Sequence, residues 1–164
     1  MKKLQNILVP TDFSSNSLNA LEYAVYLTKS TESIIHVLHC TEPISAIKNS
    51  NEDKILIHEG LIRLEEQMKK FINNVMDSKN KIIKVIRTGK AYEQILNYTR
   101  DAEIDLIVLA ANGWSGLENG ILGTVAEKVT RYSTTPVILI KNNSLAEETN
   151  HITIKNTLAE NWVG

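Results

Sequence analysis

The sequence predicts a single α/β domain in which helices cover both faces of a parallel, five-stranded sheet. Short apolar runs of strand length alternate along the chain with longer segments that repeat apolar residues at helical spacing. The short runs are apolar on both faces, which is typical of strands buried between two layers of helices. A chain of 164 residues, 43% of them hydrophobic, is also long enough to bury one substantial core.

The first half of the chain contains two expected strands and two expected helices. An apolar run at 7–9 predicts the first strand, and Ser14 and Ser15, which follow its turn, are typical helix caps. The elements then expected are a helix at 15–29, a second strand at 34–40 and, after a polar loop, a second helix at 54–76. Charged residues fill one face of this last helix, and we interpret that face as solvent-exposed.

The second half continues the alternation. The expected elements are a strand at 82–86, a short helix at 92–99, a strand at 106–110, a helix at 124–132 and a strand at 137–140. This last strand is expected at an edge of the sheet, where a bare apolar edge favours aggregation unless it is covered. Residues 1–141 should form the domain, and 142–164 should be a C-terminal extension that is either disordered or a short edge strand.

Composition excludes several classes of function. The net charge is −1 with no basic block, which argues against binding nucleic acid or an anionic membrane surface. The single cysteine, Cys40, cannot form an internal disulfide, and no apolar run approaches the ~18–20 residues of a membrane span, so we expect a soluble cytoplasmic protein. His36 and His39 should face opposite sides of a strand, which makes them a poor metal pair.

Two strand ends should face one crevice. In parallel sheets, ligands bind beyond the carboxyl ends of strands where the strand order reverses. One such end carries Pro10, Thr11 and Asp12, and the other leads into a loop with four glycines before a helix that begins at Thr124. Glycines let the backbone approach a ligand closely, and the free N–H groups at a helix start attract an anion. This arrangement is typical of a phosphate-binding site.

Known phosphate-loop and nucleophile motifs do not fit this loop. It has no GxxxxGK[ST] or GxGxxG pattern, and Gly113-Trp114-Ser115-Gly116 lacks the spacing of GxSxG. A plain alternative is a glycine-rich connection followed by a helix capped by Thr124. Ser14 and Ser15 have no identifiable base partner and are interpreted as caps rather than nucleophiles.

A family resemblance makes the site more specific. Over residues 6–141 the chain resembles the universal stress proteins: it has the opening NILVPTDFS, Leu38-His39-Cys40 in place of the family's LHV, and Val85 with Gly89 before the third helix. Nucleotide-binding members carry G-2x-G-9x-G-[S/T]. The matching positions here are Ala110, Gly113 and Gly123-Thr124, followed by Val125-Ala126-Glu127-Lys128-Val129 and Pro136-Val137.

The resemblance implies strand order 3-2-1-4-5, a Rossmann-like adenine-nucleotide-binding fold, and a regulatory stress-response module that binds ATP, with Mg or Mn possible. It implies at most weak ATPase activity, with no catalytic residue assigned, because no residue is a persuasive general base. Thr124 could assist a divalent ion through the phosphates. The implied nucleotide-binding residues are Pro10, Thr11, Asp12, Cys40, Ala110, Gly113, Ser115, Gly116, Gly123, Thr124 and Val125. A homodimer through Val137, Ile138, Leu139 and Ile140 is also implied.

Two departures from the motif leave alternatives open. Ala110 replaces the first glycine, and its methyl group is tolerable if the backbone φ is negative there. Trp114 stands where the family often has a basic residue, so it removes a phosphate contact and could instead cover the site or meet a partner. Because of these departures, a second possible function is that of a dimeric interaction protein whose nucleotide pocket is degraded. A third, which rests on fold analogy alone, is that of an enzyme acting on adenylates. Cys40 could equally be inert core.

Overall fold

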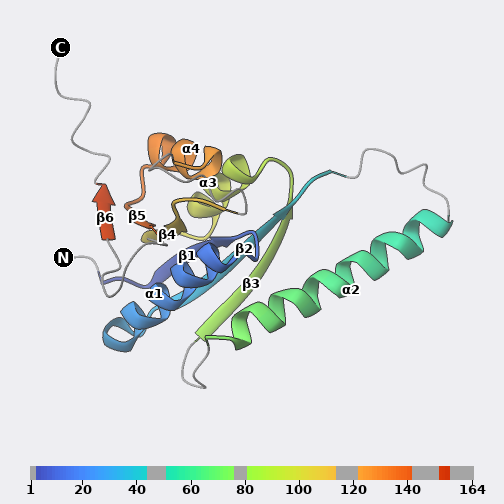
Figure 1. The fold of residues 1–164 in the computed structure, drawn as a ribbon, viewed down its shortest axis with the longest axis horizontal. Coiled ribbons are helices and arrows are strands. Elements are labelled where there is room, and N and C mark those ends of the chain that lie inside the picture. Colours follow the sequence, from blue (N-terminus) through green and yellow to red (C-terminus); the bar gives the residue numbers. More distant parts are fainter. Residues whose placement is uncertain (1–2, 44–50, 76–80, 114–121, 142–151, 156–164) are drawn as a thin grey trace, which may run out of the picture.

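A six-stranded sheet forms the centre of the protein in the computed structural model, which describes residues 3–43, 51–75, 81–113, 122–141 and 152–155 (Figure 1). Its strands are β1 (Asn6–Thr11), β2 (Ile34–Thr41), β3 (Lys81–Thr88), β4 (Leu106–Ala110), β5 (Val137–Ile140) and β6 (Ile152–Lys155). The helices are α1 (Ser15–Thr31), α2 (Asn51–Asn73), α3 (Ala91–Asp101) and α4 (Thr124–Tyr132).

The predicted parallel sheet is confirmed. The order is β3-β2-β1-β4-β5-β6, and β1 to β5 are parallel, so the order reverses between β1 and β4. The expectation that residues 137–140 form the sheet edge is wrong, because β6 pairs antiparallel with β5 on its outer side. The C-terminal extension therefore supplies a strand that covers an otherwise bare apolar edge.

Helices cover the sheet on both faces, as predicted. On one face, α1 and the C-terminal part of α2 pack against inward side chains of the strands, among them Ile7, Val9, Ile35, Val37 and Val108. On the other face, α3 and α4 pack through Ile95, Ala126 and Val129 against a second set that includes Leu8, Leu38, Ile107 and Leu109. Consecutive residues of one strand thus enter two different cores, which is why the strands are apolar on both sides.

The turn between β1 and α1 is fixed by the side chain of Ser14. Ser14 is the N-cap of α1, and its Oγ accepts a hydrogen bond from the backbone N–H of Ser17 at 3.2 Å. This is the role predicted for it, and such caps are typically worth about 1 kcal/mol. Ser15 is instead the first residue of the helix.

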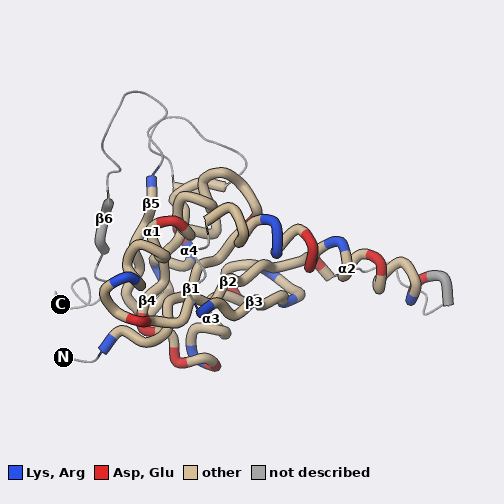
Figure 2. Tube along the Cα trace, turned by 90° about the horizontal axis from the view of Figure 1, so that it is seen from below, with Lys and Arg blue, Asp and Glu red and all other residues tan. Residues whose placement is uncertain are grey.

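Helix α2 leaves the body of the protein along much of its length. Its C-terminal residues Met68 and Phe71 are buried, whereas Leu56 and Leu61 nearer its N-terminus are 63% and 47% exposed. Figure 2 shows the helix projecting past the sheet with acidic and basic residues distributed along it. Among the helices of the described ranges, none combines the length and the apolar character that membrane crossing requires.

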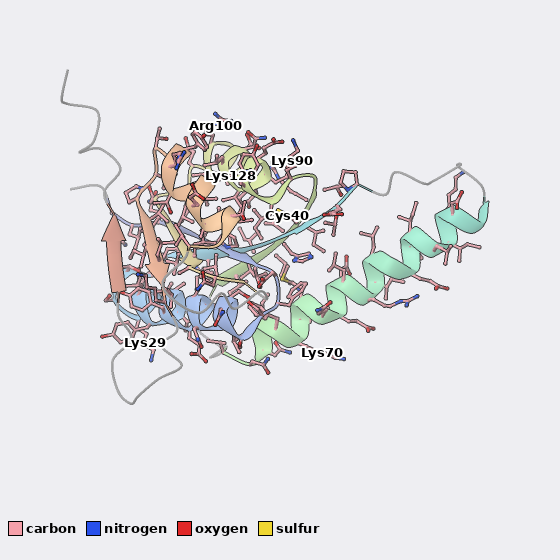
Figure 3. All side chains as sticks on the ribbon, turned by 45° about the horizontal axis from the view of Figure 1, so that its top comes forward. Lys29, Cys40, Lys70, Lys90, Arg100 and Lys128 are labelled. Carbon is pink, nitrogen blue, oxygen red and sulfur yellow. The ribbon has the colours of Figure 1, made fainter. Side chains whose placement is uncertain are left out.

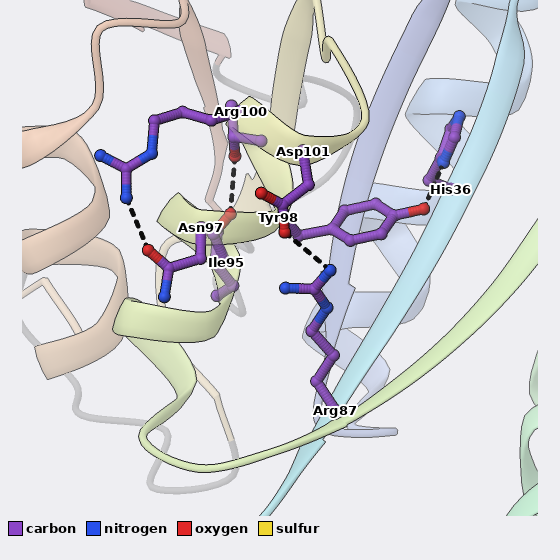
Figure 4. A network of polar contacts seen from close by, with 8 residues as sticks. His36, Arg87, Ile95, Asn97, Tyr98, Arg100 and Asp101 are labelled. Carbon is purple, nitrogen blue, oxygen red and sulfur yellow. Dashed lines mark hydrogen bonds and ion pairs between the residues drawn. The ribbon is translucent and has the colours of Figure 1, made fainter.

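A polar network that begins at the buried His36 links β2, β3 and α3. His36 on β2 is 5% exposed, and its Nδ1 lies 2.7 Å from the hydroxyl of Tyr98 while its Nε2 lies 3.3 Å from Oδ1 of Asn6. The guanidinium of Arg87 lies over the Tyr98 ring and binds Asp101 at 2.9 Å (Figure 4). His39 points to the opposite face of the strand, where its ring stacks on Phe13. The two histidines therefore diverge, as predicted.

Candidate functional site

One cavity of about 420 Å³ opens at the carboxyl ends of the central strands. It lies where the strand order reverses between β1 and β4, with β2 and α3 on one side and the start of α4 on the other. Such volumes suit a small-molecule ligand. The lining residues are Pro10, Thr11, Asp12, Leu38, His39, Cys40, Ala91, Ile95, Leu109, Ala110, Ala111, Asn112, Gly113, Gly123, Thr124, Val125 and Ala126.

Hydrogen bonds from the start of α1 hold the carboxyl group of Asp12 in place. Its Oδ1 accepts from the backbone N–H of Ser14 at 3.0 Å and from the Ser14 hydroxyl at 2.5 Å. The neighbouring Thr11 hydroxyl is buried and lies 2.9 Å from that of Ser17. The same serine therefore caps the helix and orients the only carboxylate in the described lining of the cavity.

Gly113 brings the glycine loop against Asp12. A Cβ at position 113 would overlap Oδ2 of Asp12 and lie 3.5 Å from its Cγ, so only glycine allows this approach. The side-chain amide of Asn16 on α1 donates to the carbonyl oxygen of Gly113 at 3.3 Å. Segments about a hundred residues apart in the chain thus meet, which is the convergence that the fold rules predicted.

Gly123 closes the other end of the loop. Its backbone N–H donates to the carbonyl oxygen of Ala111 at 2.8 Å, and a Cβ here would lie only 3.2 Å from that oxygen. Gly123 is also the N-cap of α4 and provides no side-chain cap, so the predicted alternative of a cap by Thr124 is not what the structure has. The first N–H groups of α4, which have no partner within the helix, lie at the cavity wall.

Ala110 fits the site without backbone strain. Among the described non-glycine residues, only Phe13, Glu32 and Glu103 have positive φ. Ala110 therefore has the negative φ at which its methyl group is tolerable. It ends β4 and is 8% exposed, and it belongs to the core on the α1 face of the sheet. The methyl group that replaces the first motif glycine is thus accommodated by packing.

The other end of the cavity is mostly apolar. Leu38, Ala91 and Ile95 contribute here, beside Cys40 on β2, which Figure 3 labels. Burial raises the pKa of the Cys40 thiol to about 11, against a smaller lowering effect of Arg87. The Nδ1 of His39 lies 2.8 Å from the carbonyl oxygen of Thr11 and must donate to it, which leaves Nε2 of the neutral ring as an acceptor.

The described lining carries one negative and no positive side chain. It contains Asp12 but no lysine or arginine, so an anionic group would depend on backbone N–H groups and the α4 dipole. Asn112 lies in the same wall, and its Oδ1 is buried without a hydrogen-bond partner in the described parts of the chain. Those parts also hold no cluster of three or more metal-binding side chains.

Most of the predicted site residues line this cavity. Ser115 and Gly116 lie outside the described residues, as does Trp114. Sequence reasoning missed several lining residues, namely Leu38, His39, Ala91, Ile95, Leu109, Ala111, Asn112 and Ala126. Ala91 and Ile95 reach the cavity only because α3 packs across β2, which no local pattern reveals. Leu38 and His39 could have been inferred as neighbours of Cys40 at the end of β2.

Comparison with known proteins identifies the family of this chain. The sequence profile of the universal stress protein family matches residues 3–141. The chain belongs to the universal stress protein family. A curated relative, universal stress protein YxiE of Bacillus subtilis, is 28% identical over 144 residues, covering 82% of this chain and 97% of the relative. Residues 142–164 lie beyond the stretch matched by the family profile.

Solved structures of this family share the fold. The structure of the MJ0577 protein, a universal stress protein of Methanocaldococcus jannaschii, superposes with a TM-score of 0.75 at 23% identity and covers 88% of this chain and 100% of that one. A universal stress protein from Arabidopsis thaliana, solved with AMP bound, has a TM-score of 0.61 at 20% identity over 85% of this chain and 93% of that one. These similarities confirm the Rossmann-like architecture.

Proposed function

We propose that this universal stress protein binds an adenine nucleotide, ATP, in the cavity at the carboxyl ends of β1 and β4 and acts as a regulatory stress-response module. The observation that carries the proposal is the approach of Gly113 to Asp12 beside the uncapped start of α4. That arrangement places acceptor and donor groups around one cavity. The nucleotide carried by the Arabidopsis relative agrees with the ligand class.

The two ends of the cavity suit the two ends of a nucleotide. The apolar end, with Leu38 and Ile95, offers the flat base a dry surface, and Cys40 would meet the base edge through its backbone. The phosphates would lie beside Gly123, against the N–H groups of Thr124 and Val125, where the helix dipole favours negative charge. A Mg²⁺ or Mn²⁺ ion carried by the phosphates would have the Thr124 hydroxyl within the same wall.

The sugar would lie between these ends. Asp12 is an acceptor for ribose hydroxyl groups, and Ser14 already fixes its orientation. The Oδ1 of Asn112, which has no hydrogen-bond partner among the described residues, is a second acceptor in the same wall, and an unmade hydrogen bond at a buried atom costs about 1–3 kcal/mol. Donation by a ligand would remove that cost. Pro10, Thr11, Ala110 and Gly113 would shape the pocket, with Ser115 and Gly116 as further phosphate contacts.

Hydrolysis should be slow. Fast phosphoryl transfer needs a group that orients the attacking water and cations that stabilise the transition state. The described lining provides one carboxylate, which is engaged by Ser14, and no lysine or arginine. A bound nucleotide would therefore remain intact, and the occupancy of the cavity would follow the concentration of free nucleotide. This suits a sensing module better than an enzyme.

A homodimer through Val137, Ile138, Leu139 and Ile140 needs the outer edge of β5, which β6 occupies. We therefore propose dimerisation through this edge only for molecules whose β6 has left it. An interaction protein with a degraded pocket is the alternative function, and the departures Ala110 and Trp114 motivated it. The unstrained fit of Ala110 favours the nucleotide-binding proposal over that alternative.

Calorimetry with ATP and with GTP, each with Mg²⁺, tests the proposal, together with mass analysis of small molecules released from the purified protein. Binding of ATP in the micromolar range and weaker binding of GTP is the expected result. An absence of heat at millimolar ATP, with no nucleotide released on denaturation, would support the degraded-pocket alternative. A steady-state phosphate-release assay should show at most slow turnover.

A further inference from the structure

The cavity proposed to hold a nucleotide has no lysine or arginine in its described lining, although the phosphate chain of ATP is strongly negative. This leaves backbone N–H groups and the dipole of α4 to oppose the charge. A lysine side chain is long and flexible, so a cation whose Cα lies outside the lining can still reach it. Lys128 on α4 has the position that this requires.

Lys128 shares a face of α4 with Thr124. The two residues are four positions apart, one turn of the helix, and Thr124 lines the cavity. The Cα–Cβ bonds of a helix tilt toward its N-terminus, so a long side chain at 128 covers the turn that begins at Thr124. The stem of Lys128 is therefore directed toward the end of α4 where the phosphates would lie.

The ring of Tyr92 holds the ammonium group of Lys128 in the structure. Nζ of Lys128 lies 4.4 Å from the centroid of this ring, and the Tyr92 hydroxyl donates to Glu93 at 2.8 Å, which fixes the ring in place. Tyr92 directly follows Ala91, the first residue of α3 and part of the cavity lining. The contact thus bridges α3 and α4, the two helices whose first residues both line the cavity.

The neighbouring cations are bound differently. Arg131 on the same helix pairs with Glu127 at 2.9 Å, and Lys90 pairs with Glu93 at 3.5 Å. Within the described ranges, Lys128 makes no ion pair, and its half-buried side chain has the ring contact instead. A cation–π contact is generally weaker than a charge-assisted hydrogen bond to a phosphate oxygen. Exchanging the first for the second is favourable and needs only rotations within one side chain.

We propose that Lys128 is the phosphate-binding cation of this cavity, and that its ammonium group leaves the Tyr92 ring to donate to an oxygen of the bound phosphate chain. The inference rests on the proposed nucleotide function and adds a residue that distinguishes ligands by their phosphates. Adenosine has no such acceptor, so with adenosine bound the ammonium group stays on Tyr92.

Calorimetry with adenosine and with ATP and Mg²⁺ tests the inference in the native chain and two variants. Lys128→Met keeps an unbranched apolar stem without the charge, whereas Lys128→Arg keeps the charge and can also stack on the ring. ATP affinity should fall about 10-fold or more in Lys128→Met, as for other hydrogen bonds to charged groups, and stay near the native value in Lys128→Arg. Adenosine affinity should be the same in all three.

Lys70→Met is the matched control. Lys70 lies in the last turn of α2, which packs on the opposite face of the sheet from α4 (Figure 3). The substitution makes the same change of charge away from the cavity, so ATP affinity should remain native. Added KCl should weaken ATP binding more in the native chain and in Lys70→Met than in Lys128→Met, because salt screens the charge contact that Lys128→Met lacks.

The two ligands separate this role from a structural one. If Lys128 only supported the fold, Lys128→Met would lose affinity for adenosine and ATP alike, and its salt dependence would remain native. Either that result or an unchanged ATP affinity in Lys128→Met would overturn the inference and leave the proposed function standing. A native chain that binds neither ligand would overturn both.

Discussion

The carboxylate of Asp12 occupies the space that a side chain at position 113 would need. Asp12 follows β1 and Gly113 follows β4, so their contact brings the two halves of the chain together at the point where the strand order reverses. The contact explains why the second glycine of the motif is retained although the first has become Ala110. It also suggests how the site can be disabled without disturbing the cores.

Replacing Gly113 with alanine should weaken ATP binding. The added methyl group overlaps Oδ2 of Asp12, so the loop or the carboxylate must move. Overpacking of this kind typically costs 1–3 kcal/mol, and a cost of that size within the site corresponds to a roughly 10-fold or larger loss of affinity. Calorimetric titration of Gly113→Ala against the native chain measures it.

Gly60→Ala is the matched control for that variant. Gly60 lies inside α2, and no atom lies within 4 Å of the Cβ it would gain. Its replacement should raise the free energy of unfolding by about 0.5–1 kcal/mol through helix propensity and leave ATP affinity unchanged. Equal affinities in Gly113→Ala and Gly60→Ala would argue against the assigned site.

Ser14→Ala should affect both stability and binding. Ser14 caps α1 and donates to Asp12, so its removal should lower the free energy of unfolding by about 1 kcal/mol and loosen the carboxylate. Ser15→Ala at the exposed first residue of α1 is the control and should change neither. Urea unfolding and ATP titration distinguish the two, and identical behaviour of both variants would contradict this role for Ser14.

The buried His36 should make stability depend on pH. Burial lowers its pKa below 6.5, so the unfolded chain takes up the proton before the folded one does. Its contribution to stability is therefore present above about pH 6.5 and is lost as pH falls toward the lowered folded value, with a slope of at most about 1.4 kcal/mol per pH unit. Urea unfolding between pH 7.5 and 5 measures this loss.

Two variants test the assignment to His36. The groups around its ring are the Tyr98 hydroxyl and the Asn6 amide, with Arg87 beyond Tyr98. His36→Gln should flatten the pH dependence between 7.5 and 5, although it should also lower stability overall. His58→Gln, on the exposed surface of α2, is the control, and the free energy of unfolding should depend on pH as it does in the native chain. An unchanged slope in His36→Gln would contradict the account.

The thiol of Cys40 should react slowly and report on the cavity. With its pKa raised to about 11, the thiolate is scarce at pH 8. Alkylation by iodoacetamide should therefore be about 100-fold slower than in the urea-unfolded chain, where a cysteine has a pKa of about 8.5. ATP should slow it further, because Cys40 lines the cavity. Acceleration by ATP, or no effect at saturation, would place the nucleotide elsewhere.

Much of the fold could be predicted from the sequence because its strands and helices are encoded locally. The run at 106–110 and the helix at 124–132 match the structure, since each has the length and periodicity of one element. Other predicted boundaries differ from the observed ones by a few residues. Helix α2, for example, was expected from residue 54 and begins at Asn51. The edge position of β5 was wrong because a short alternating segment such as 152–155 is equally compatible with a disordered tail.

The site was less predictable than the fold. Glycine spacing indicated Gly113 and Gly123, but the overlap with Asp12 depends on how two distant loops meet. The effect of Ala110 could not be judged without its backbone conformation and its neighbours in the core. No sequence pattern pointed to Asn112, because the burial of its Oδ1, which has no hydrogen-bond partner within the described ranges, is a consequence of tertiary packing.

An NMR titration of the native protein with ATP and Mg²⁺ tests the central claim most directly. The backbone amides of Gly113, Gly123, Thr124 and Val125 line the proposed phosphate site, so their resonances should shift in a saturable way. The same amides in Gly113→Ala should require higher ATP concentrations. Unshifted amides at millimolar ATP, or shifts confined to other parts of the protein, would contradict the account.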